Sequence, residues 1–260
     1  MWLAAYERRI ERQIAEFGRQ LMVAAAPQAG ESVLDVGCGT GQTTLALARA
    51  VGPTGSALGI DISRTLIGVA RTQVLANLRY EVLDAATHAF APAAIDLLFS
   101  RFGVMFFGDP VAAFANLRRA LKSAGRVTFL CWRSAAENPW QRLPIQAAAP
   151  HLPPMPRPGP GEPGPFAFGD RDHVQGILAK AGFADVSFQP VDGTLVLGHD
   201  VADVTEGLRR FGPLARVLTE VPATDADKAL AAVALALQPH VGPQGVALPG
   251  AAWIVQARPA

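Results

Sequence analysis

The chain has 260 residues, half of them apolar and 17% charged, with a formal net charge of +1. This length is enough to bury a full core as one large domain or as one domain with an appendage. The nearly cancelled charge argues against a protein that holds nucleic acid by general electrostatics, and small neutral ligands suit it better. Cys38 and Cys131 lie far apart with no CxxC partner, which indicates neither a zinc site nor a disulfide framework. We expect no metal and a reducing, cytoplasmic setting.

An amphipathic helix is predicted at the N-terminus. Its apolar residues recur every three or four positions, at Leu3, Tyr6, Ile10, Ile14, Phe17 and Leu21. The opposite face mixes arginines with glutamates, whereas a membrane-surface helix is normally more one-sidedly basic. The chain has no long uncharged apolar run and no signal-peptide pattern, so we expect no stable membrane insertion. The helix is therefore expected to pack against the rest of the domain.

From Glu31 onward, β-rich runs alternate with helical patterns. The runs read SVLDV, SALGID, RYEVLD, IDLLFS and GRVTFLCW, and the helical patterns between them cover Thr43–Val51, Ser63–Leu75 and Val111–Leu121. Ser63 is predicted to cap its helix, and Pro110 to be the first residue of the third one. Such alternation predicts a parallel sheet wrapped by helices.

The amino-acid composition changes after Trp132. Residues 150–165, PHLPPMPRPGPGEPGP, are mostly proline and glycine and are incompatible with a helix or an inner strand. We interpret them as a loop or lid over the edge of the sheet rather than as a solvated linker or a proline-rich ligand. A helix is then predicted at Asp172–Ala181, strands at Ala184–Pro190 and Ala252–Ala257, and helical segments between residues 200 and 238.

The first strand runs into a glycine-rich loop, VLDVGCGTGQTT, from Val33 to Thr44. Glycines at 37, 39 and 41 permit a sharp strand-to-helix turn and let a ligand approach the main-chain N–H groups. The nicotinamide-dinucleotide fingerprint needs G-x-G-x-x-G or a final alanine, but position 42 is Gln and the third glycine comes one residue early.

Three acids follow three successive predicted strands. Asp35 precedes the loop, where it would repel a pyrophosphate but attract a ligand that carries an amino group and a sulfonium. Asp61, about 20 residues after the loop, has the spacing of an acid that accepts hydrogen bonds from ribose hydroxyls. Asp84 offers an acceptor for an adenine amino group, and Ala85 an unhindered backbone N–H. The set favours S-adenosylmethionine over NAD.

The ordered motifs VLDVGCGTGQTT, GIDIS, LDAATHAF, IDLLFSRFGVMFF and LRRALKSAGRVTFLCWR resemble those of class I S-adenosylmethionine-dependent methyltransferases, especially the bacterial small-molecule branch related to ubiquinone/menaquinone biosynthesis methyltransferases. The resemblance covers residues 31–133 and extends more weakly to about residue 190. It implies a Rossmann-like, doubly wound, mostly parallel seven-stranded α/β sheet with helices on both faces, an N-terminal helix and a Pro-rich insert. It also implies that Gly37, Cys38 and Gly39 lie against the methionine part, that Asp61 holds the ribose, that Ile62 packs on adenine, and that Asp84 and Ala85 recognise its edge.

The acceptor side is less defined by sequence. Ser100 and Arg101 follow the fourth strand, where members of this family line the methionine end and the acceptor mouth; Arg101 could orient an acidic group or form a structural ion pair. His151 and His173 flank the Pro-rich segment and are the candidate general bases, although loop histidines are more often solvated. Aromatic residues after position 101 suit a flat or apolar acceptor, or simply pack the core. SRFG lacks the Asn/Asp-Pro-Pro-aromatic motif of amino DNA methyltransferases, which argues against DNA as the acceptor.

The expected function is methyl transfer from S-adenosylmethionine to a small, apolar or aromatic metabolite, with an O, C or N acceptor left open. A NAD-linked oxidoreductase and a non-catalytic S-adenosylmethionine-binding protein are the alternatives. We expect one domain, 1–260, divided into a helical cap (1–30), a cofactor-binding core (31–133), a lid or acceptor segment (134–172) and C-terminal helices and strands (173–260). A monomer or homodimer is expected.

Overall fold

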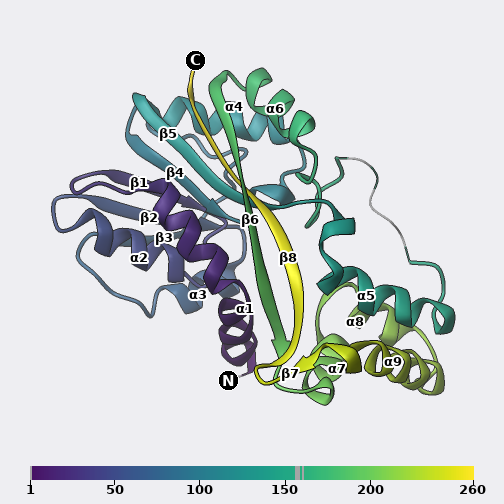
Figure 1. The fold of residues 1–260 in the computed structure, drawn as a ribbon. Helices are drawn as coiled ribbons and strands as arrows, with labels where there is room; N and C mark the ends of the chain where they lie inside the picture. The colour runs from purple at the N-terminus through teal and green to yellow at the C-terminus, as the bar shows by residue number, and fades with distance from the viewer. Residues whose placement is uncertain (1, 156–158, 160) are drawn as a thin grey trace.

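The computed structural model describes residues 2–155, 159 and 161–260, with side chains from Arg9 onward. Within this part of the chain, one mixed sheet of eight strands has the order β3-β2-β1-β4-β5-β8-β6, and the two-residue β7 pairs with β8 outside that path (Figure 1). The strands are β1 (Ser32–Val36), β2 (Ser56–Asp61), β3 (Leu78–Val82), β4 (Ile95–Arg101), β5 (Leu121–Trp132), β6 (Phe183–Gly198), β7 (Val241–Gly242) and β8 (Gly245–Pro259). The first five are parallel neighbours, and β8 is antiparallel to β5 and β6. The predicted mostly parallel sheet is confirmed.

The helices match most of the predicted segments. They are α1 (Trp2–Ala25), α2 (Gln42–Val51), α3 (Arg64–Ala70), α4 (Pro110–Ala120), α5 (Pro139–Ala148), α6 (Arg171–Lys180), α7 (Val201–Arg210), α8 (Gly212–Glu220) and α9 (Ala223–Leu237). The Ser63 side chain accepts a hydrogen bond from Leu66 N, and Pro110 is the first residue of α4, as predicted. Helix α3 ends earlier than predicted because the Thr72 hydroxyl bonds the Val69 carbonyl and the chain turns there.

Helices cover both faces of the sheet. Successive side chains of a strand point to opposite faces. Gln256 of β8 donates to the Thr128 hydroxyl of β5 and to the Ala24 carbonyl at the end of α1, whereas the neighbouring Phe129 ring of β5 lies 5.5 Å from the Phe114 ring of α4. Helices α1 and α4 therefore lie on opposite faces, as the doubly wound architecture requires.

The last two long strands extend well beyond their predicted bounds. Strands β6 and β8 pair from Phe183↔Pro259 to Gly198↔Val246, past the glycines that interrupt the apolar pattern. Two of those glycines face the Phe17 ring of α1, and a Cβ at Gly193 would lie 3.0 Å from it. Strand glycines often mark such close approach, and no local pattern reveals it.

The C-terminal helices lie apart from β1–β3. Figure 1 shows α5, α7, α8 and α9 gathered beside one end of the β6–β8 ribbon, where α5 packs on α9 and α7 on α8 and α9. Residues 156–158 and 160 of the predicted lid lie outside the described residues. Among the residues that follow them, Gly164 donates to the Met105 carbonyl and Phe168 is buried in the core.

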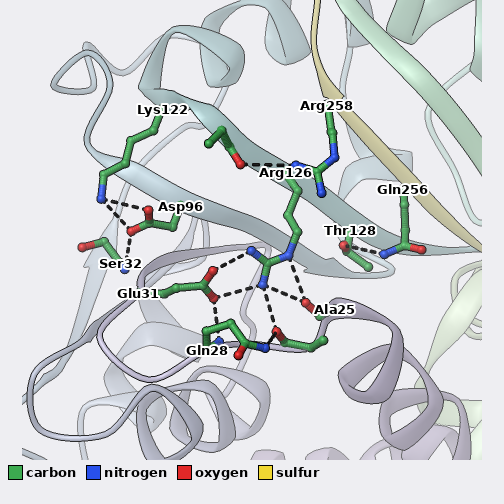
Figure 2. A network of polar contacts seen from close by, with 12 residues as sticks. Ala25, Gln28, Glu31, Ser32, Asp96, Lys122, Arg126, Thr128, Gln256 and Arg258 are labelled. Carbon is green, nitrogen blue, oxygen red and sulfur yellow. Dashed lines mark hydrogen bonds and ion pairs between the residues drawn. The ribbon is translucent and has the colours of Figure 1, made fainter.

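Helix α1 is fixed at its C-terminal end by Arg126 of β5 (Figure 2). The guanidinium donates to the Ala25 carbonyl at 2.9 Å and to Glu31 Oε1 at 2.6 Å, which satisfies carbonyl groups that a helix end leaves open. Burial raises the pKa of Glu31, but hydrogen bonding and the charge of Arg126 outweigh it and hold that pKa below its usual value. Because this anchor lies at the start of β1, the other half of α1 reaches the carboxyl ends of the strands.

Candidate cofactor and acceptor site

A cavity of about 750 Å³ lies at the carboxyl ends of β1, β2, β3 and β4. The strand order reverses between β1 and β4, and open α/β sheets bind ligands at such switch points. The volume is within the range of small-molecule sites. Its lining comes from α1 (Ile10, Glu11, Ile14), the glycine loop (Val36, Gly37, Cys38, Gly39, Thr40, Thr43), the ends of β2 and β3 (Ile60, Asp61, Ile62, Leu66, Leu83, Asp84, Ala85, Ala86) and the segment after β4 (Arg101, Phe102, Gly103, Phe106, Phe107, Gly108, Asp109).

The glycine loop has the conformation that its sequence predicts. Gly37, Gly39 and Gly41 have φ angles of 70°, 56° and 86°, a region in which residues other than glycine are strained. A Cβ at Gly37 would lie 2.7 Å from the Gly103 backbone, and one at Gly41 would meet the Tyr80 ring. At Gly39 a Cβ would meet no atom within 4 Å. This glycine therefore leaves open space at the cavity wall, where a ligand can lie directly on the main chain.

The cavity lining is acidic. Asp61, Asp84 and Asp109 carry negative charge there, and the one further acid, Glu11, is paired with the only described basic residue of the lining, Arg101. Asp61 accepts hydrogen bonds from Gly39 N at 3.0 Å and from Ser63 N at 2.8 Å, so its carboxylate is held against the loop. This excess of negative charge favours a cationic ligand and disfavours a pyrophosphate.

Asp35 lies beneath the cavity rather than in its wall. Its side chain is fully buried, and Oδ2 accepts hydrogen bonds from the hydroxyls of Thr43 at 2.6 Å and Thr44 at 2.7 Å. Oδ1 has no partner among the described atoms. Burial raises the pKa of Asp35 to about 6, against the lowering effect of the two threonines. In this position Asp35 does not contact a ligand in the cavity, and the charge of its carboxylate acts through the glycine loop.

The predicted adenine-side residues come together at one end of the cavity. Ile62 is 75% exposed although it is a large apolar residue, which leaves its side chain free to contact a ring. Asp84 Oδ1 accepts from Ala86 N at 2.8 Å, and the Ala85 carbonyl is held by Asn116. The Ala85 N–H donates to no acceptor in the described part of the chain. An open apolar face, a carboxylate and a free N–H thus lie side by side.

Two of the predicted site residues have structural roles beside the cavity. Ser100 does not line the cavity; its hydroxyl donates to the Val36 carbonyl at 2.7 Å and accepts from Gly103 N at 3.2 Å, joining the loops after β1 and β4. Cys38 lines the cavity but is buried, and burial raises the pKa of its thiol, so a thiolate nucleophile is disfavoured.

Arg101 forms an ion pair with Glu11 of α1. The two guanidinium nitrogens donate to the two carboxylate oxygens at 2.7 and 2.5 Å, and the side chains are 12% and 29% exposed. The pair joins the end of β4 to the N-terminal half of α1 at the wall of the cavity. Of the two roles considered for Arg101, the geometry favours the structural ion pair.

His151 and His173 are both exposed and neither lines the cavity. The His173 ring lies beside Gly161, at the start of α6. The structure therefore does not bring these candidate bases together with the cofactor-site residues. No group of three or more His, Cys, Asp or Glu among the described residues could hold a metal ion, and no helix there is long and apolar enough to cross a membrane.

Phe102 has a φ of 65°, unusual for a bulky residue. Its ring lines the cavity and stacks on Trp132 with centroids 4.1 Å apart, and Trp132 in turn lies 5.1 Å from Trp140. Stacking and a hydrogen bond from Phe102 N to the Leu130 carbonyl hold the strained backbone in place. The aromatic lining suggested by the sequence is present at Phe102, Phe106 and Phe107, whereas Met105 is buried in the core.

Sequence reasoning did not assign Ile10, Glu11, Ile14 and Asp109 to the site. In the sequence the first three lie on a helix that is expected to pack against the domain, and no local pattern says which element it covers. Asp109 accepts a hydrogen bond from Ala112 N and precedes the predicted Pro110, so the signal available was a helix cap.

Comparison with known proteins agrees with this arrangement. Residues 33–125 match a family described as a methyltransferase domain. This match confirms the resemblance to class I S-adenosylmethionine-dependent methyltransferases that the motifs indicate.

Aklanonic acid methyltransferase DauC from Streptomyces sp. (strain C5) is 35% identical over 130 residues, which are 48% of this chain and 59% of the relative. A demethylmenaquinone methyltransferase from Staphylococcus aureus is 37% identical over 103 residues, 39% of this chain and 43% of the relative. The matched region thus spans about half the length of these curated relatives. The YcgJ protein from Bacillus subtilis shares the fold, with a TM-score of 0.61 at 16% identity over 94% of this chain and 98% of that one.

Proposed function

We propose that this chain binds S-adenosylmethionine in the cavity at the ends of β1–β4 and transfers its methyl group to a small, apolar or aromatic acceptor. One observation carries the proposal: an acidic cavity at the switch point, with an open backbone surface at Gly39. Cationic ligands suit the charge, and a ligand in van der Waals contact with a main chain suits the missing Cβ.

The residues that line the cavity fit the separate parts of the proposed cofactor. Gly37, Cys38 and Gly39 are the proposed surface for the methionine part, with the buried charge of Asp35 behind it. Asp61 has lone pairs left to accept from ribose hydroxyls, since each oxygen is used by one N–H. Ile62 offers an apolar face to adenine, and Asp84 with the Ala85 N–H offers an acceptor and a donor to its edge.

When bound, S-adenosylmethionine supplies a methyl carbon: an acceptor lone pair bonds to it, the C–S electron pair stays on sulfur, and a neutral acceptor gives up a proton. The chain's own contribution is alignment and exclusion of water. Ile10, Ile14 and Phe102 give the acceptor end of the cavity an apolar wall, and the Arg101–Glu11 pair holds α1 over it. No histidine lines the cavity within the described residues, which favours an acceptor that is already ionised or otherwise activated.

The alternatives make different demands on the same cavity. A NAD-linked oxidoreductase would place a pyrophosphate among Asp61, Asp84 and Asp109, where like charges repel it. A non-catalytic S-adenosylmethionine-binding protein shares every cofactor contact and differs only in lacking turnover. A cytoplasmic setting and a monomeric or dimeric state complete the proposal; the first rests on two buried, unpaired cysteines.

Calorimetric titration with S-adenosylhomocysteine tests the assignment residue by residue. We expect Asp61→Asn and Asp84→Ala each to weaken binding by about tenfold to a hundredfold, the usual effect of losing a hydrogen bond to a charged group. Asp170→Ala is the matched control, because Asp170 also accepts backbone N–H bonds but lies outside the cavity. Unchanged affinity in both cavity variants would mean that the site is misplaced.

A further inference from the structure

A second, smaller cavity of about 160 Å³ lies along a neighbouring face of helix α1. Ile10 lines both cavities; Glu11 and Ile14 turn to the first, and Arg9 and Gln13 to the second. Residues four apart share one face of a helix, so α1 is a wall with one cavity on each of two adjacent faces. The remaining walls come from α5, β6, α7 and α8, through residues such as Trp140, Ile145, Leu208, Phe211 and Leu214.

The surface that the second cavity offers to a ligand is apolar. Arg9 and Gln13 already donate to the Leu197 carbonyl, at 2.9 and 3.0 Å, and Arg9 is paired with Asp203. Among the described lining residues, the polar side chain without a hydrogen bond is that of Gln141. A ligand there would therefore meet hydrophobic walls and a single amide.

A row of aromatic rings lies between the two cavities. Phe102 of the first cavity stacks on Trp132, which lies 5.1 Å from Trp140 of the second. The Trp140 indole N–H donates at 2.8 Å to the buried Asn138, which fixes the ring in position. The partition thus consists of Ile10 on one side and this aromatic row on the other.

We propose that the second cavity binds the apolar substituent, a single ring or short alkyl chain, of the methyl acceptor, whose reacting end passes Ile10 into the first cavity. This inference rests on the proposed function. Its volume fits, because a cavity of about 150 Å³ lined by aliphatic and aromatic residues holds a benzene-sized ring. Acceptors with an apolar tail are then selected by burial of that tail, and the reacting end is directed toward the methionine end of the cofactor site.

The test measures binding of a graded series of 4-alkylphenols, from phenol to 4-butylphenol, by calorimetry at saturating S-adenosylhomocysteine. Burial of each methylene should raise affinity about fourfold. Leu208→Trp and Ile145→Trp, which fill the cavity from partly buried positions on two different helices, should abolish this dependence on chain length and leave S-adenosylhomocysteine affinity unchanged. Leu235→Trp, on an exposed position of α9, is the matched control and should behave as the wild type.

The outcomes separate the two proposals. Failure of the wild type to bind S-adenosylhomocysteine overturns the proposed function, whatever the phenols do. Normal S-adenosylhomocysteine binding with no rise in affinity along the phenol series overturns the acceptor subsite alone. So does a rise that persists in both filled variants, because the alkyl chain must then lie elsewhere.

Discussion

The buried Asp35 gives the protein a pH dependence that one substitution should remove. Burial raises the pKa of this carboxyl from an ordinary 3.8 to about 6 in the folded chain. A raised folded-state pKa means that the folded state binds the proton more tightly, so the stabilisation is complete below about pH 4 and is lost as pH rises through 6. At about 1.4 kcal/mol per pKa unit, the separation corresponds to about 3 kcal/mol.

Asp35→Asn keeps the shape and one acceptor oxygen for Thr43 and Thr44 but cannot ionise. The assay is urea unfolding of both proteins between pH 4 and pH 7.5, read as the wild-type minus variant difference in free energy of unfolding. Carboxylates such as Glu31 are common to both proteins and cancel in this difference. We expect the difference to fall by about 2.5 kcal/mol over the range, mostly below pH 6.5. A difference that stays flat, or that grows with pH, would refute the assigned burial effect.

Substitutions at three further places in the fold have defined outcomes. Gly39→Ala should lower the free energy of unfolding by about 1 to 2 kcal/mol because of the positive φ, and should weaken S-adenosylhomocysteine binding at least tenfold. In Gly37→Ala the new Cβ would meet the Gly103 backbone, so this variant should largely fail to fold. Circular dichroism measures the folding of both variants, and calorimetry measures their binding. Glu11→Gln should lower the free energy of unfolding by about 2 kcal/mol because it leaves a mostly buried Arg101 without its partner, and Glu16→Gln, in an exposed pair on the same helix, should cost less than about 1 kcal/mol in the same urea titration. Arg126→Met should lower the free energy of unfolding by about 3 kcal/mol, because it leaves the last carbonyls of α1 and the Glu31 carboxylate without their partner. A melting temperature equal to that of the wild type would contradict the role of Arg126 as the anchor of α1.

The first half of the fold was predictable because its signals are local. Strand runs that end in an acid, a glycine loop and capped helices each specify their own geometry, and positive φ angles at Gly37, Gly39 and Gly41 follow from that loop. The cofactor-side residues Asp61, Ile62, Asp84 and Ala85 line one cavity for the same reason: parallel strands bring their carboxyl ends to one edge.

The remainder depended on contacts between distant segments. The length of β6 and β8 reflects pairing with each other across glycines that face Phe17. The contribution of α1 to both cavities follows from anchors at Arg126 and Arg101, more than 75 residues away in sequence. Asp35 sits under the loop and not in the cavity wall, because two threonine hydroxyls of α2 hold it there.

The most direct measurement is a calorimetric titration of the wild-type chain with S-adenosylhomocysteine, with NAD as the control ligand. The acidic cavity and the open backbone at Gly39 predict saturable binding of one S-adenosylhomocysteine per chain and no binding of NAD. Binding of NAD, or of neither ligand, would contradict the assignment of this cavity to S-adenosylmethionine.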